Sequence, residues 1–236
     1  MPRYNRALVK ISGEALQGPD AFGIHQSTIR AIAEDLKTAA ETGVELAVVI
    51  GGGNLVRGAQ IAGMGLSRAA ADSMGRIATV MNAIAMEAQL EAVGQTARAM
   101  SADPMPSIIE TYSRQRAASE LSKGRIVLLA GGVGAPFFTT DTGAALRAAE
   151  LDCAVLLKAT NVDGVYTADP KKDQSARRYE RLTHDEAISK SLKVMDTAAF
   201  ALAKENRLPV IVFSIREPGA ITAALAGGLN ATLVTP

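Results

Sequence analysis

Cysteine, tryptophan and aromatic residues in general are scarce in this sequence. It contains one cysteine and no tryptophan, and Phe and Tyr supply its 4% aromatic content. A single cysteine, Cys153, excludes an intramolecular disulfide, and its apolar surroundings predict a buried thiol in a reducing compartment. Hydrophobic residues still make up 48% of the 236 residues, so aliphatic side chains and alanines must fill the core. This composition favours helices packed on a parallel sheet, in one large domain or two small ones.

The sequence also lacks an excess of either charge. Lys and Arg number 25 and Asp and Glu number 24, which leaves a formal net charge of +1. Such a balance provides no global basic field to attract nucleic acid or an anionic membrane. No apolar run approaches the roughly 20 residues of a membrane span, and the first residues, Met-Pro-Arg-Tyr-Asn-Arg, carry no secretory signal. We expect a cytoplasmic protein whose partners are small molecules or other protein chains.

Residues 131–141 are the most informative stretch, with the sequence Gly-Gly-Val-Gly-Ala-Pro-Phe-Phe-Thr-Thr-Asp. The apolar run at residues 126–130 predicts a buried strand before it, and the apolar spacing in residues 142–151 predicts a helix after it. Three glycines in four positions let the backbone approach a ligand, and the closing Thr-Thr-Asp residues are N-cap types. A helix N-terminus below such a loop suits a phosphate or an anionic substrate. A tight turn without a ligand is the alternative.

Two predicted strands carry a lysine near their carboxyl ends. Lys10 lies in the apolar run at residues 7–11, before Ser12 and Gly13, and Lys158 ends the run at residues 154–158. Side chains in such positions are placed to reach the crevice where α/β proteins bind ligands. For Lys10 the alternative is a surface lysine whose stem packs on apolar residues.

A second glycine-rich loop, Gly51-Gly52-Gly53, follows the predicted strand at residues 46–50. Its amide groups are suited to an anion, and Arg57 is placed to bind phosphate oxygens. A flexible turn is the alternative. Neither glycine-rich loop matches the P-loop pattern, and the chain contains no G-x-G-x-x-G dinucleotide signature.

Asp72 and the segment after Lys158 supply further candidate nucleotide contacts. Asp72 is predicted at the start of a helix that continues to Leu90, where the alternative role is to interact with the helix dipole. Tyr166 is placed to lie against a base, and Asp169 to hold a ribose or lie near a metal. A β-hairpin with an Asp-Gly turn at residues 163–164 is compatible with both roles.

The remaining pattern predicts alternating short strands and helices. Strands are expected at residues 96–100, 107–109, 210–213 and 232–234, and helices at residues 29–40, 113–122, 183–189 and 196–205 and from residue 218. His25 and His184 fall in polar stretches without partners, so neither is predicted to bind a metal or to act as a general base.

This set of residues suits phosphoryl transfer. The chain offers glycine-rich loops, cations and scattered aspartates, and it shows no Ser, Cys or His nucleophile constellation. The transition state of phosphoryl transfer is rich in charge, so positioning and cations suffice, with Mg²⁺ on the phosphates. From these residues alone we predict an α/β phosphotransferase that acts on a small anionic acceptor.

Four motifs carry a resemblance to a known family: Val9-Lys10-Ile11-Ser12-Gly13-Glu14, Val49-Ile50-Gly51-Gly52-Gly53-Asn54, Pro136-Phe137-Phe138-Thr139-Thr140-Asp141 and Leu157-Lys158-Ala159-Thr160-Asn161-Val162-Asp163-Gly164-Val165-Tyr166. In this order they resemble the amino acid kinase superfamily, and within it the bacterial uridylate kinase family. The resemblance covers essentially the whole chain, including Leu192-Lys193-Val194-Met195-Asp196. It implies an α/β fold, with residues 1–236 as a single three-layer αβα domain around a mostly parallel sheet. It also implies a homohexamer that uses Mg²⁺ and transfers the γ-phosphoryl group of ATP to UMP, giving UDP and ADP.

The resemblance implies a role for each matching residue. The implied catalytic residues are Lys10, Arg57, Asp141 and Lys158, with Asp141 orienting Lys10. The implied ATP contacts are Lys10, Ile11, Ser12, Gly13, Gly53, Arg57, Thr160, Asn161, Tyr166 and Asp169. The implied UMP contacts are Gly52, Asp72, Val133, Gly134, Ala135, Pro136, Phe137, Phe138, Thr139 and Thr140. No residue is predicted to bind the metal directly, because Mg²⁺ is held through the nucleotide phosphates.

One residue departs from the family pattern. Where the family usually has Gly-Asn-Pro-Phe-Phe, this chain has Ala135 in place of Asn, and the missing amide predicts weaker contact with UMP or UTP. The family is often activated by GTP and inhibited by UTP, and residues 18–23 resemble the region tied to GTP control. Two other functions are compatible with the same fold: another kinase of the superfamily, and a non-catalytic hexamer that binds a nucleotide or an anion. A hexamer without catalysis should have lost the cations that contact the phosphoryl group, such as Lys10 and Arg57.

Overall fold

The computed structural model describes residues 3–56, 65–170, 172–192 and 194–236. Within them the strands form one nine-stranded sheet in the order β4-β3-β5-β2-β1-β6-β8-β9-β7. Neighbouring strands run parallel except β8 and β9, which are antiparallel. The strands are β1 (Arg6–Ile11), β2 (Glu45–Ile50), β3 (Ala97–Ser101), β4 (Glu110–Thr111), β5 (Ile126–Ala130), β6 (Val155–Thr160), β7 (Arg181–Thr183), β8 (Val210–Ser214) and β9 (Ala231–Thr235).

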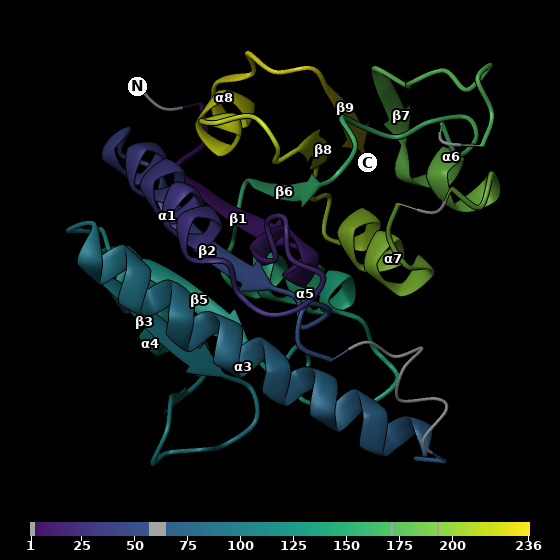
Figure 1. Cartoon of the computed structure of the whole chain (residues 1–236). Helices are drawn as coiled ribbons and strands as arrows, with labels where there is room; N and C mark the ends of the chain where they lie inside the picture. The colour runs from purple at the N-terminus through teal and green to yellow at the C-terminus, as the bar shows by residue number, and fades with distance from the viewer. Residues whose placement is uncertain (1–2, 57–64, 171, 193) are drawn as a thin grey trace.

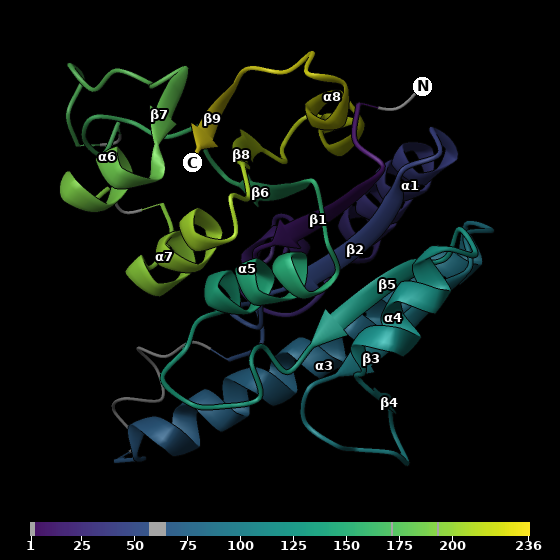
Figure 2. The same cartoon turned by 180° about the vertical axis from the view of Figure 1, so that it is seen from behind.

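Helices cover both faces of this sheet, as Figures 1 and 2 show. Their bounds are α1 (Gln26–Glu41), α3 (Arg68–Ala92), α4 (Arg114–Leu121), α5 (Thr140–Glu150), α6 (His184–Ser189), α7 (Thr197–Glu205) and α8 (Ala220–Ala226), with a 3₁₀ helix at Gly13–Leu16. Buried side chains of α1, α3 and α8 join one hydrophobic cluster, and those of α4, α5, α6 and α7 join the other. The predicted three-layer αβα architecture is confirmed.

The central strands are buried on both faces, which explains their continuous apolar sequences. Every residue of β5 is buried, as are residues 7–11 of β1 and residues 46–50 of β2. Cys153 is also buried as predicted, and burial raises the pKa of its thiol to about 12. None of the described helices is long and apolar enough to cross a membrane.

Four expectations about local structure were wrong. Residues 107–109 form a turn, and the edge strand β4 begins at Glu110 instead. Helix α3 begins at Arg68, after the N-cap residue Ser67, so Asp72 lies in its second turn and not at its start. Residues 161–164 form bends and no two-residue hairpin, because Tyr166 bridges to the distant Arg178. The strand β7 was not predicted, since its three residues are too few to show a period.

Candidate active site

Two lysines and one aspartate form a charged cluster at the carboxyl ends of the central strands. Lys10 of β1 pairs in register with Lys158 of β6, and both side chains are buried, with 8% and 7% of their surface exposed. Lys10 Nζ lies 2.8 Å from Asp141 Oδ1, and Lys158 Nζ donates a hydrogen bond to Asp141 Oδ2. The Lys10 contact is an ion pair, because Asp141 Oδ1 accepts no hydrogen bond from any described residue. One carboxylate therefore holds two cations side by side.

The pKa values follow from this crowding. Burial alone would raise the pKa of Asp141, but the charges of Lys10 and Lys158 outweigh it and lower that pKa. Burial lowers the pKa of Lys158 to about 8, and the like charge of Lys10 acts in the same direction. Near neutral pH the cluster carries two positive charges and one negative charge, which suits a developing negative charge on a ligand.

A cavity of about 590 Å³ lies between α3 and the loop at residues 131–139. Asp72 projects into it from α3 and accepts a hydrogen bond from Phe137 N at 2.8 Å. Arg68 contacts both carboxylate oxygens of Asp72 at 3.1 Å. The backbone hydrogen bond from Phe137, followed by Arg68, lowers the pKa of Asp72. The residues on the wall of this cavity that the sequence had singled out are Gly52, Gly53, Asp72, Val133, Ala135, Phe138, Thr139 and Thr140.

In the Gly51-Gly52-Gly53 loop, close packing requires glycine at positions 51 and 52, where an added Cβ would come within 3.0 Å of a neighbouring atom. A Cβ on Gly52 would come within 2.7 Å of Gly75 O and 2.8 Å of Ala78 Cβ on α3. A Cβ on Gly13 would come within 2.6 Å of Gly51 O, so the loops after β1 and β2 touch. This close packing excludes the reading of the segment as a flexible turn.

The loop at residues 131–139 is fixed at both ends. Thr79 Oγ1 of α3 accepts a hydrogen bond from Gly131 N at 2.8 Å. At the other end, Thr139 is the N-cap of α5 and accepts hydrogen bonds from Asp141 N and Thr142 N. Its N-cap role was predicted from sequence. The N-cap thereby fixes the first turn of α5, from which Asp141 reaches both lysines.

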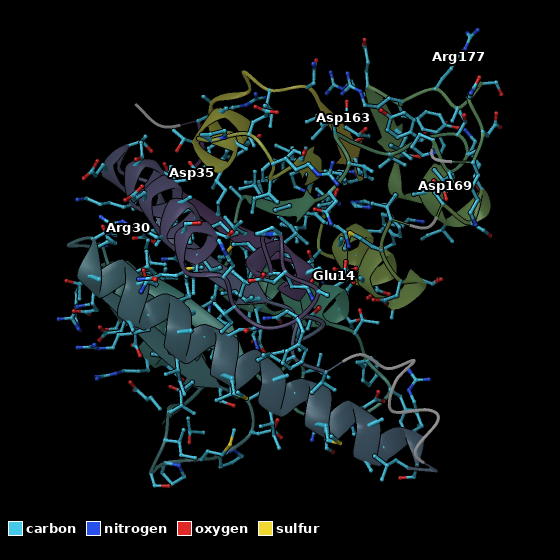
Figure 3. The ribbon with its side chains drawn as sticks, viewed as in Figure 1. Glu14, Arg30, Asp35, Asp163, Asp169 and Arg177 are labelled. Atoms are coloured by element: carbon cyan, nitrogen blue, oxygen red, sulfur yellow. The ribbon has the colours of Figure 1, made fainter. Side chains whose placement is uncertain are left out.

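A second cavity, of about 670 Å³, borders the charged cluster. Lys10 and Lys158 line it, together with Ser12, Thr160, Asn161, Tyr166 and Asp169 from the predicted set. In Figure 3, Glu14 lies near the centre of the molecule and Asp169 near α6, and both belong to the wall of this cavity. Tyr166 donates a hydrogen bond to Asp163 Oδ1 at 2.7 Å, which fixes the orientation of its ring.

Several predicted site residues do not line either cavity. The Ile11 side chain is fully buried in the core, and Gly13 packs against the loop after β2. Gly134, Pro136 and Phe137 belong to the loop above the first cavity but are not part of its wall. Arg57 lies outside the described residues.

The expectation that His184 lies in polar surroundings without a partner was wrong. His184 is fully buried, its Nε2 atom lies 2.9 Å from Leu208 O, and its ring meets the ring of Phe200 edge-on. Burial lowers its pKa. His25 also has partners, since its Nδ1 atom lies 3.1 Å from Thr28 Oγ1. Both histidines serve local structure, and neither lines a described cavity wall.

The chain matches known proteins over nearly its whole length. The model of the amino acid kinase family matches residues 5–214. The chain belongs to the amino acid kinase family. Uridylate kinase from Azorhizobium caulinodans is 63% identical over 233 residues, which cover 99% of this chain and 98% of the relative. The structure of UMP kinase from Bacillus anthracis is 35% identical, with a TM-score of 0.95 over 100% of this chain and 97% of the other. Uridylate kinase from Archaeoglobus fulgidus is 30% identical, with a TM-score of 0.74 over 99% and 100% of the two chains.

Two side chains that support the site of this amino acid kinase were not singled out from its sequence. Asn82 of α3 is buried, donates to Gly51 O at 2.7 Å and exchanges hydrogen bonds with Asn54. Asp196 caps α7 and accepts hydrogen bonds from Thr139 Oγ1 and Thr142 Oγ1 at the start of α5. A buried amide at one position of a helix carries no sequence signal of its own. For Asp196 the signal was available, because an Asp before a helical pattern is an N-cap type.

Proposed function

We propose that this chain is a uridylate kinase, which transfers the γ-phosphoryl group of ATP to UMP and releases UDP and ADP. The observation that carries the proposal is the pair of buried lysines on one carboxylate: Lys10 and Lys158 line one cavity, and Asp141 follows Thr140, which lines the other. Relatives named uridylate kinase at 55–63% identity support the choice of acceptor. The rival reading as a non-catalytic anion-binding protein finds no support, because both buried lysines and their shared carboxylate are in place.

We assign UMP to the cavity below the loop at residues 131–139, where Asp72 binds the ribose. ATP occupies the other cavity, with Tyr166 and Asp169 at its nucleoside end. In this arrangement Lys10 and Lys158 contact the phosphates from both nucleotides, and Asp141 keeps the two ammonium groups oriented. Catalysis then consists of positioning the acceptor oxygen in line with the γ-phosphorus and stabilising the equatorial oxygens by the lysines. Gly52 and Gly53 bring main-chain N–H groups to the phosphates.

The side chains around the two cavities fit a Mg²⁺ ion that is bound by the nucleotide phosphates and enters the site with them. Among the described residues no group of three or more His, Cys, Asp or Glu side chains is arranged to hold a metal, and Asp141 already faces two lysines. Phosphate oxygens and water would supply the ligands. When bound, Mg²⁺ neutralises charge on the β- and γ-phosphates.

We also infer the domain organisation and the assembly of the chain. Since all described strands belong to one sheet, residues 1–236 form a single domain. The helix α3 lies along one side of the molecule (Figure 1) and exposes the apolar side chains of Met74, Ile77, Met81 and Ile84. We propose that this stripe is covered by a second copy of the chain, within the homohexamer that the family predicts. GTP activation, UTP inhibition and a cytoplasmic location remain predictions of the same kind.

Product identification tests the proposed reaction. The protein is incubated with UMP, Mg²⁺ and ATP labelled in its γ-phosphoryl group, and the products are separated by chromatography. Label in UDP, with none when EDTA removes Mg²⁺, supports the proposal. Label released as inorganic phosphate, or retained in ATP while UMP stays bound, refutes it.

A further inference from the structure

Arg147 lies on α5, about two helical turns beyond Thr140, the last α5 residue on the wall of the UMP cavity, and it does not line that cavity itself. Its side chain is buried, with 7% of the residue exposed. Its Nη2 atom donates a hydrogen bond to Gly132 O at 3.3 Å, and its Nη1 atom donates to Glu150 Oε2 at 2.6 Å. A buried guanidinium thus joins the body of α5 to the first residues of the loop at 131–139.

The ring of Tyr112 packs against this guanidinium and holds it in place. The guanidinium carbon of Arg147 lies 4.0 Å from the centre of the Tyr112 ring, which is a stacking contact. The Tyr112 hydroxyl donates to the same Glu150 Oε2 atom at 2.7 Å. Tyr112 N in turn donates to Ser101 O at 2.8 Å, so the ring is anchored to the end of β3. Arg147, Tyr112 and Glu150 therefore form a closed set of contacts with a defined geometry.

Gly132 connects the contacts of Arg147, Tyr112 and Glu150 to the wall of the UMP cavity. It adopts a left-handed backbone conformation with a φ of 58°, and a Cβ on Gly143 of α5 would come within 3.1 Å of its Cα atom. Gly131 is tied to α3 through Thr79, while Gly132 is tied to α5 through Arg147. Gly132 and Val133 line the cavity directly. The position of Gly132 thus sets the position of the cavity wall.

We infer that Arg147 is a positioning residue for the acceptor nucleotide, which acts by fixing the Gly132 carbonyl through its stacked and ion-paired guanidinium. The inference rests on the proposed function, since it assigns this cavity to UMP. Lysine could not replace Arg147, because the contacts require two donors in a planar fork and a flat face against the ring. Neither Arg147 nor its partners Gly132, Tyr112 and Glu150 belong to the described wall of the second cavity, so we expect ATP binding to be independent of Arg147.

The test compares Arg147→Met with Arg6→Met. Arg6 is a matched control because it also donates to a carboxylate, Glu45, and to a main-chain carbonyl, that of the α5 C-cap residue Leu151, and it does not line the UMP cavity. UMP dissociation constants are measured by calorimetry without ATP, and KM values for UMP and ATP by steady-state kinetics. We expect Arg147→Met and Arg147→Lys to raise the UMP dissociation constant and KM about tenfold, the size of one charge-assisted hydrogen bond. The KM for ATP should stay unchanged.

A milder variant keeps the test valid if Arg147→Met does not fold. Tyr112→Phe removes the hydroxyl that donates to Glu150 but keeps the ring against the guanidinium, so it should raise the UMP dissociation constant only about threefold. The inference is overturned if Arg147→Met and Tyr112→Phe bind UMP as the unmodified protein does, or if Arg6→Met weakens UMP binding equally. A failure of the proposed function has a different signature, because the unmodified protein itself would then not bind UMP.

Discussion

Lys10 and Lys158 are direct partners in the parallel register of β1 and β6, and both reach the carboxylate of Asp141. Two buried ammonium groups on adjacent strands repel each other, so the arrangement depends on the anion between them. Lys10 and Lys158 line the second cavity, and Thr140, which precedes Asp141 in α5, lines the first. We therefore propose that the same three side chains determine both the stability and the chemistry of the site.

Replacing Asp141 by Asn should lower both the turnover and the stability. Asn keeps the shape but removes the charge, so both lysines lose their orientation and turnover should fall about 100- to 1,000-fold. The variant should also lose about 3–5 kcal/mol of unfolding free energy, the range for breaking a buried ion pair. Steady-state kinetics and chemical denaturation measure the two losses. Asp152→Asn is the control, since Asp152 pairs with the exposed Arg114; equal losses in both variants would contradict the role of Asp141.

The pKa of Lys158 predicts an alkaline limit to activity. Burial and the charge of Lys10 lower this pKa to about 8, so Lys158 loses its proton as the pH rises through that value. We expect kcat/KM, which reports the free enzyme, to fall above about pH 8. Bound phosphates favour the charged form, so the fall in kcat should occur at higher pH than the fall in kcat/KM.

Replacing Lys158 by arginine tests whether Lys158 is the titrating group. Arginine stays charged throughout this range, so Lys158→Arg should shift the alkaline fall of kcat/KM to higher pH. A profile whose alkaline limb stays near pH 8 in Lys158→Arg would assign the titration to another group.

Replacing Asp72 should change the KM for UMP and not the KM for ATP. In the free protein its carboxylate binds Phe137 N and Arg68, and we propose that ribose hydroxyls replace part of this contact. Asp72→Asn should raise the KM for UMP about tenfold, by loss of a hydrogen bond to a charged group, with an unchanged KM for ATP. Asp185→Asn is the control. It removes an exposed ion pair between Asp185 of α6 and Lys204 of α7 and should change neither KM value. An equal increase in both KM values for Asp72→Asn would count against the assignment of the cavity.

Ala135 marks a difference from the family pattern within the UMP cavity. Restoring an amide with Ala135→Asn should strengthen UMP and UTP binding by about 0.5–1.5 kcal/mol if a neutral hydrogen bond forms. Calorimetry with each nucleotide measures the change. A decrease in both affinities would show that the cavity has adapted to alanine.

The exposed stripe on α3 should control assembly. Met74, Ile77, Met81 and Ile84 recur at spacings of three and four residues, so they form one apolar face of the helix. Ile77→Glu should lower the particle mass in solution, measured by light scattering after size exclusion. Ala31→Glu places the same side chain at an exposed position of α1 and should leave the mass unchanged. A monomeric unmodified protein would refute the interface.

The sequence was most informative where each signal was local. Apolar runs located β1, β2, β5 and β6, and the lysines at the ends of β1 and β6 were recognised individually. Their adjacency was not predictable from the pattern, because strand order is decided by long-range pairing. The same limit applies to Asn82, whose partners Asn54 and Gly51 lie about thirty positions away along the chain.

His184 shows how tertiary packing can override local composition. Its neighbours in sequence, Thr183 and Asp185, are polar and exposed or partly exposed, which suggested a surface position. The burial comes from Leu208 and Phe200, which follow it by 24 and 16 positions. A single polar residue at the first position of a short helix gives no indication of such a contact.

The central claim is that the cluster around Lys10 transfers a phosphoryl group to UMP in particular. The most direct measurement is a coupled ADP-release assay with ATP and Mg²⁺, run with UMP, CMP, AMP, aspartate, N-acetylglutamate and carbamate as separate acceptors. We predict strong turnover with UMP alone, and its loss in Lys10→Ala. Turnover with another acceptor in preference to UMP, or activity that survives in Lys10→Ala, would contradict the account.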